Sequence, residues 1–104
     1  MKRFIALIAT LAAGVLVSTP SLADMALATA KNCTSCHAVD KKVLGPSYKE
    51  VATKYAGQAD AVDKLAGKIM KGGAGAWGPV PMPANAQVSA DEAKKLVTWI
   101  LTLK

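Results

Sequence analysis

The chain carries a run of residues whose types and spacing suit covalent haem attachment: Cys33, Thr34, Ser35, Cys36 and His37. Two cysteines separated by two residues, with a histidine directly after the second, are typical of c-type haem sites. A two-residue spacer in a helical turn sets both thiols along one haem edge, where each can form a thioether with a vinyl group. The imidazole of His37 can then bind the iron as an axial ligand. The pattern therefore predicts one covalently bound haem c.

Two other kinds of site use the same cysteine spacing: a redox-active disulfide and one half of a zinc site. A tetrahedral zinc site needs about four protein ligands, and this chain offers only two cysteines and one histidine. A thioredoxin-like disulfide follows a strand in a βαβ pattern, and the sequence shows no such pattern. Haem attachment is therefore favoured over both alternatives.

The second axial ligand of the iron must be another residue type, because His37 is the only histidine. Residues 72–88 are rich in glycine and proline and predict a long loop, which is uncommon in a small domain unless it is functional. Met82 lies in this loop between two prolines, which restrict the backbone and lower the entropy lost when the sulfur is held in place. Met82 is the predicted sixth ligand, and the alternative is a surface methionine over an open or water-ligated iron.

The first 23 residues have the pattern of a secretory signal peptide. A basic pair precedes an apolar run from Phe4 to Val17, which is too short to span a bilayer comfortably. Pro20 and small residues up to Ala23 then suit cleavage by signal peptidase. We expect residues 1–23 to be removed on export to the periplasm, and an uncleaved membrane anchor is the alternative. Export agrees with haem attachment, which bacteria carry out outside the cytoplasm.

The remaining residues, 24–104, are enough for one small domain and too few for a large core. This part has no phenylalanine, and its aromatic residues are Tyr48, Tyr55, Trp77 and Trp99. A bound porphyrin would therefore supply the centre of the core. Without Lys2 and Arg3 of the signal, 11 basic residues stand against seven acidic ones, a modest formal net charge of +4, whereas a nucleic-acid-binding surface needs a denser basic face. We expect no nucleic-acid partner.

Hydrophobic spacing and capping residues predict about four short helices. The first runs from Asp24 to Lys31, with Asp24 capping its first turn. Two middle helices follow Ser47 and Asp60 and end at glycines. A capping box that begins at Ser89 opens the last helix. The chain is therefore predicted to be all-α.

Four motifs give residues 24–104 a close resemblance to the small class I bacterial cytochromes c of the cytochrome c-551 (c8) type. The motifs are Cys33-Thr-Ser-Cys-His37, Gly45-Pro46-Ser-Tyr48, Tyr55-Ala-Gly-Gln58 and Trp77-Gly-Pro-Val-Pro-Met82-Pro-Ala-Asn85. The last motif is far more specific than the cysteine motif alone. The resemblance implies a small class I cytochrome c fold, in which about four short helices wrap around one haem.

The resemblance also assigns roles to residues around the haem. Pro46 offers its backbone carbonyl to the ring N–H of His37 and so orients the ligand. Asn85 hydrogen-bonds toward the sulfur of Met82. Two side chains reach the haem propionates: Lys68 and Trp77. One departure is Ala28, where relatives often carry an aromatic residue, and it leaves open how tightly the first and last helices pack.

The function implied is one-electron transfer through an Fe(III)/Fe(II) couple, with His/Met ligation raising the potential relative to two nitrogen ligands. Because both axial positions are then filled, we expect an electron carrier and not an enzyme. It would act as a monomer between a membrane cytochrome complex and a periplasmic terminal reductase or oxidase. A haem enzyme or gas sensor with an open sixth position is the alternative. Five lysines would either steer a partner or simply add solubility: Lys41, Lys42, Lys49, Lys68 and Lys71.

Overall fold

The structure, a computed structural model, describes Gly14 and residues 20–103, with the side chains of the folded part described from Asp24 onward. Within these residues there are four α-helices, one short 3-10 helix and no strand, which confirms the predicted all-α class. The elements are α1 (Pro20–Ala30), η1 (Cys33–Ser35), α2 (Tyr48–Lys54), α3 (Ala61–Lys71) and α4 (Ala90–Ile100). None of these helices is long and apolar enough to cross a membrane. Most of the predicted signal peptide lies outside the described residues.

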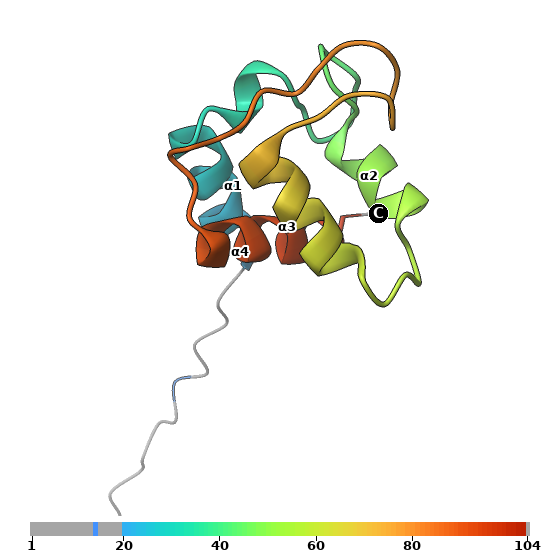
Figure 1. Cartoon of the computed structure of the whole chain (residues 1–104). Coiled ribbons are helices and arrows are strands. Elements are labelled where there is room, and N and C mark those ends of the chain that lie inside the picture. The colour runs from blue at the N-terminus through green and yellow to red at the C-terminus, as the bar shows by residue number, and fades with distance from the viewer. Residues whose placement is uncertain (1–13, 15–19, 104) are drawn as a thin grey trace, which may run out of the picture.

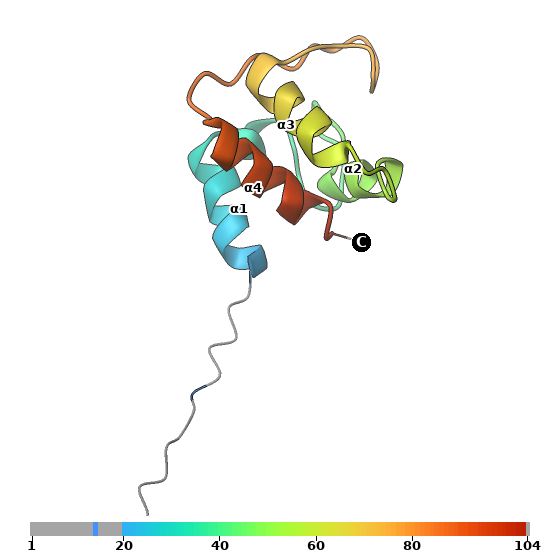
Figure 2. The same cartoon turned by 60° about the horizontal axis from the view of Figure 1, so that its bottom comes forward.

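The central packing element is α4, which contacts α1, α2 and α3 (Figure 1). Figure 2 shows α4 lying across α1, with α3 beside it. The spacing of its apolar residues puts them on one side of the helix, facing the core. The sequence pattern did not include Trp99 in this face, yet Trp99 is buried and meets the ring of Tyr48 edge-on, with centroids 5.3 Å apart. The buried residues of α4 are Ala93, Leu96, Val97, Trp99 and Ile100.

Local sequence explains where α2 and α4 begin. The hydroxyl of Ser47 accepts a hydrogen bond from the backbone N–H of Glu50, and the Glu50 carboxylate accepts one from the N–H of Ser47, both at 3.1 Å. Ser89 and Glu92 repeat this reciprocal pair at 3.2 and 3.1 Å. Each pair satisfies two N–H groups that a helix start otherwise leaves without partners. The predicted capping box before α4 and the predicted cap at Ser47 are both present.

The first helix differs from the prediction, because α1 begins at Pro20 and not at Asp24. Proline is tolerated at the first helical position, where its missing N–H would have no helical partner in any case. Asp24 therefore does not cap the helix. It is buried within α1, with its Oδ1 atom 4.0 Å from Nζ of Lys95 in α4. Cleavage after Ala23 would remove about one turn of α1.

Helices α1 and α4 are in contact, and Ala28 of α1 is only 1% exposed. Ala28 belongs to the same core cluster as the buried residues of α4, so this alanine is part of the packed core. Lys31, just after α1, adds polar contacts to the start of α4. Its Nζ atom lies 3.2 Å from Oε2 of Glu92, and it donates to the carbonyl of Gln87 at 3.0 Å. The first and last helices therefore form one packed unit.

Candidate haem-binding site

One cavity of about 810 Å³ brings together all eight residues predicted to form the haem site. This volume lies within the range of roughly 300–1,000 Å³ that is usual for small-molecule and cofactor sites. Apolar residues of α2, α3 and α4 form much of the remaining wall, among them Val51, Leu65 and Leu96. The eight predicted residues are Cys33, Cys36, His37, Pro46, Lys68, Trp77, Met82 and Asn85. A large, mostly apolar cofactor fits this lining.

The two cysteines are presented by η1 and the residue that follows it. Asn32, with φ of 66°, turns the chain out of α1 in a left-handed conformation that asparagine tolerates better than most residues. The N–H groups of Cys36 and His37 both donate to the carbonyl of Cys33, at 3.2 and 3.0 Å. This is the helical turn that the haem motif requires.

Both thiols are half-buried, and no disulfide joins them. Burial raises the pKa of the Cys33 thiol above its ordinary value, and the neighbouring Cys36 adds to that rise. A redox-active pair works through a thiolate whose pKa is lowered. The raised pKa of Cys33 is the opposite of what a catalytic disulfide requires.

The imidazole of His37 is held from several directions by residues 45–48. Its Nδ1 atom lies 2.8 Å from the carbonyl oxygen of Pro46, the contact that the resemblance implied. The ring of Tyr48 stacks on it, with centroids 5.6 Å apart and planes inclined by 27°. A Cβ atom at Gly45 would lie 2.5 Å from Cε1 and 2.8 Å from Nδ1 of the imidazole, so only glycine fits there. Because Nδ1 faces Pro46, Nε2 is the ring nitrogen left available for a metal.

Residues 45–48 are themselves fixed to the haem motif and to the core. The N–H of Gly45 donates to the carbonyl of Cys36 at 2.8 Å, and the N–H of Tyr48 donates to that of Ala38 at 2.9 Å. Tyr48 is only 3% exposed. The Gly45-Pro46-Ser-Tyr48 motif was visible in the sequence, but the contacts of its glycine and tyrosine with the imidazole were not predicted. The only signal available was that small and aromatic residues flank the proline.

Met82 is presented by the loop that residues 72–88 were predicted to form. Its backbone exchanges two hydrogen bonds with Gly73. The N–H of Gly73 donates to the carbonyl of Met82 at 3.0 Å, and the N–H of Met82 donates to the carbonyl of Gly73 at 2.8 Å. Gly72 has φ of 71°, and any Cβ there would collide with the Met82 carbonyl oxygen. The side chain of Met82 is half-buried and packs against the core. The loop therefore has a fixed base at the predicted ligand.

Asn85 fastens the end of this loop to α3. Its Nδ2 atom donates to the carbonyls of Ile69 at 2.8 Å and Pro83 at 3.3 Å. Its Oδ1 atom accepts from Gln87 at 3.2 Å. Both amide hydrogens therefore point at carbonyl groups, and a hydrogen bond to the Met82 sulfur is not among these contacts. The predicted contact with sulfur stays a prediction.

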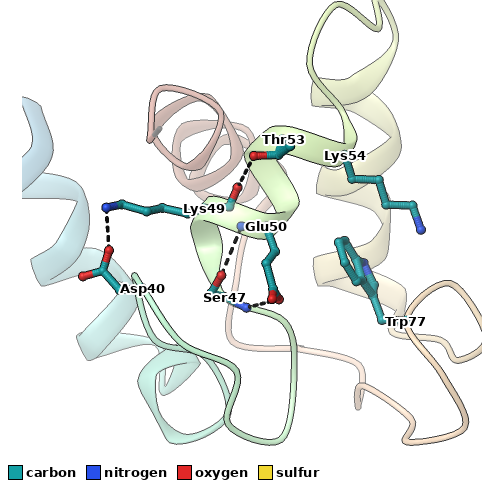
Figure 3. A pocket seen from close by; sticks show the side chains of 7 residues that line it. All are labelled: Asp40, Ser47, Lys49, Glu50, Thr53, Lys54 and Trp77. Carbon is teal, nitrogen blue, oxygen red and sulfur yellow. Dashed lines mark hydrogen bonds and ion pairs between the residues drawn. The ribbon is translucent and has the colours of Figure 1, made fainter.

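Lys68 and Trp77, predicted to reach haem propionates, both line the cavity. Lys68 lies beside the loop base, with Nζ 3.1 Å from the position that a Cβ of Gly73 would take. Trp77 also borders a shallower surface groove of about 480 Å³ outside the cavity, where Lys54 lies over its ring (Figure 3). The other residues of this groove are Asp40, Ser47, Lys49, Glu50 and Thr53. Contacts of Lys68 and Trp77 with propionates remain predictions.

Helices wrapped around an apolar cavity, with a Cys-x-x-Cys-His turn in its wall, define the small class I cytochrome c fold. The family model described as Cytochrome c matches residues 25–104, and the chain belongs to this family. Family membership implies one covalently attached haem c and electron transfer as the general function. The two cysteines in the wall of the cavity are consistent with this attachment.

Named relatives are similar over nearly the whole chain. Cytochrome c-551 of Allochromatium vinosum is 54% identical over 87 residues, which cover 84% of this chain and 93% of the relative. Cytochrome c-551 of Pseudomonas aeruginosa is 48% identical over the full length of both chains. The crystal structure of wild-type cytochrome c552 of Nitrosomonas europaea is 52% identical and superposes with a TM-score of 0.75, covering 77% of this chain and 99% of that one.

Proposed function

We propose that the protein is a periplasmic electron carrier in which His37 and Met82 ligate the iron of a haem bound through Cys33 and Cys36. The observation that carries this proposal is a single cavity lined by both thiols, one imidazole and one thioether. Haem c supplies a one-electron Fe(III)/Fe(II) couple when bound.

The chain's own residues then have distinct tasks. Cys33 and Cys36 attach the cofactor, so that it cannot dissociate. The Pro46 carbonyl accepts a hydrogen bond from Nδ1–H of His37, which fixes the tautomer and makes Nε2 a stronger donor to a metal. The soft sulfur of Met82 favours the ferrous iron and so raises the potential. Lys68 and Trp77 are proposed to contact the propionates.

A carrier and a haem enzyme differ in whether the sixth iron position is open. The half-buried Met82 side chain and the two backbone hydrogen bonds at its base support a filled position. With no open site, neither substrate nor gas reaches the iron. The test is a titration of the exported protein with cyanide in the ferric state and carbon monoxide in the ferrous state. We expect slow, weak binding, and rapid saturation by either ligand would favour an enzyme or a sensor.

The location and the partners belong to the same proposal. Removal of residues 1–23 leaves a chain that begins at Asp24, and its mass in a periplasmic extract should be that of this chain plus one haem. The proposed partners are a membrane cytochrome complex and a terminal reductase or oxidase, approached by a monomer. Lysines near the cavity, including Lys42 and Lys68, would steer encounter with acidic partners. Electron-transfer rates that do not change with ionic strength would contradict the steering.

A further inference from the structure

We propose that Lys54 is a positioning residue that latches the loop carrying Met82 onto α2 and so limits how often the sixth iron position opens. This inference rests on the proposed ligation of iron by Met82. It concerns an exposed lysine outside the haem site, one for which the sequence indicated no role.

The loop has two points of closure. At its base, Gly73 and Met82 exchange two backbone hydrogen bonds. At its far end, the N–H of Gly75 donates to the carbonyl of Gly78 at 3.0 Å, which closes a tight turn. Ala76 and Trp77 therefore form the tip of the loop, and neither residue takes part in the hydrogen bonds at the base.

Lys54 makes two contacts with this tip. Its Nζ atom donates to the carbonyl of Ala76 at 2.9 Å and lies 4.4 Å from the centroid of the Trp77 ring (Figure 3). A lysine ammonium has three donors and a point charge, so one group can satisfy a carbonyl and an aromatic face together. Among the described residues, no other side chain from outside the loop makes a hydrogen bond to residues 74–80.

The backbone that carries Lys54 is itself held in place by the core. Lys54 is the last residue of α2, and the next residue, Tyr55, is buried in the core at 6% exposure. The loop, by contrast, contributes only Met82 of residues 73–82 to the packing against the core cluster, and most of its other residues line the haem cavity. Few apolar contacts and exposed backbone are the conditions under which a segment opens locally without global unfolding. The Lys54 contacts favour the closed loop, and removing them raises the population of the open loop.

The test compares haem-loaded ferric variants by the rate of cyanide binding, at low cyanide concentration, where the loop opens and closes faster than cyanide binds and the rate is proportional to the open population. Lys54→Leu keeps an apolar stem and removes the ammonium group, whereas Lys54→Arg keeps the charge and the donors. Lys64→Leu is the matched control, because Lys64 is exposed and lies 5.8 Å from the Tyr55 ring without a contact to the loop. We expect Lys54→Leu to bind cyanide about fivefold to seventyfold faster, the range for the loss of one hydrogen bond plus one exposed cation–π contact. Lys54→Arg and Lys64→Leu should match the parent protein.

Amide hydrogen exchange supplies a readout that does not depend on the iron. In Lys54→Leu the Gly75 amide at the tip should lose protection, while the Met82 amide at the base should lose less. Unchanged cyanide rates together with unchanged Gly75 exchange would overturn the latch. Failure of the proposed ligation looks different, because the parent protein would then bind cyanide as fast as Met82→Ala. In that case Gly75 exchange alone decides whether Lys54 holds the tip.

Discussion

The two sides of the cavity are built in opposite ways. On the side of His37, residues 45–48 contact the imidazole by hydrogen bond, ring stacking and backbone, and Tyr48 ties them to α4. On the side of Met82, an exposed loop is held by one backbone pair at its base, by Asn85 and by Lys54. One predicted ligand is therefore held by residues tied to the core, and the other is held by a loop with few anchors.

This difference predicts how the two sides respond to mutation. Changes on the His37 side should reduce the stability of the whole fold, because the same contacts support the core. Changes on the Met82 side should alter ligation at the iron and leave most of the fold in place.

Replacing both Cys33 and Cys36 with alanine should remove the haem, which both sides of the cavity share. The difference between the two sides should then disappear. We expect no covalent haem and a largely unfolded chain, because the cavity of about 810 Å³ would be left empty in a small domain. Mass spectrometry and far-ultraviolet circular dichroism of the exported protein measure both results. A well-folded, haem-free variant would show that the cofactor does not organise the core.

Gly45→Ala should damage the His37 side selectively. The new Cβ would lie 2.5 Å from Cε1 of His37, so the imidazole or the backbone must move. The expected cost is about 1–3 kcal/mol in the free energy of unfolding. Thermal and denaturant unfolding of the haem-loaded protein measure it.

Gly67→Ala is the control for Gly45→Ala. Gly67 lies inside α3, and a Cβ there meets no atom within 4 Å. The substitution should be neutral or should stabilise the helix by roughly 0.5–1 kcal/mol, because alanine is the better helix former. If both variants lose the same stability, the close fit at Gly45 is not what matters.

Asn85→Ala should weaken the Met82 side and cost the fold less than Gly45→Ala. The variant loses the hydrogen bonds from Nδ2 to the carbonyls of Ile69 and Pro83. We expect about 1–2 kcal/mol less stability and faster cyanide binding, since the loop end is released from α3. A loss of stability as large as that of Gly45→Ala, with no change in cyanide binding, would reverse the proposed contrast.

Glu92→Gln should give the smallest effect, because Glu92 caps α4 at the surface and belongs to neither side. The backbone N–H of Ser89, and then Lys31, lower the pKa of its carboxyl. A lowered pKa means that the ionised group adds stability above its ordinary pKa and that this gain disappears as the pH falls through the lowered value. The variant should melt slightly below the parent at neutral pH and match it in acid. A difference in melting temperature between the variant and the parent that grows in acid would contradict this explanation.

Much of this architecture was predictable because its signals are local. Ser47, Ser89 and Gly57 mark helix ends within a few residues of chain, and the haem motif and the proline-bracketed methionine are each contiguous. The start of α1 was predicted wrongly, because Pro20 looked like a break and lies at the first helical position. The neighbouring residues alone do not distinguish a proline that breaks a helix from a proline at the first position of one.

The contacts that position the ligands were not predictable in the same way. Tyr48 contacts Trp99, and Lys54 contacts Ala76. The two residues of each pair are far apart in the sequence and come together only in the folded protein. Helical spacing marked Tyr48 as a core residue but did not show that its ring stacks on His37. For Lys54 the sequence carried no signal at all, since a lysine at the end of a helix is ordinary surface.

The most direct test of the account is the near-red absorption of the ferric, haem-loaded protein, where a thioether bound to iron gives a weak band. Three proteins are compared: the parent, Met82→Ala, and Met70→Leu as a control, because Met70 lies in α3 and is 37% exposed. We predict that the band is present in the parent and in Met70→Leu and is lost in Met82→Ala, which keeps its covalent haem. An unchanged band in Met82→Ala would contradict the account, because another residue would then hold the sixth position.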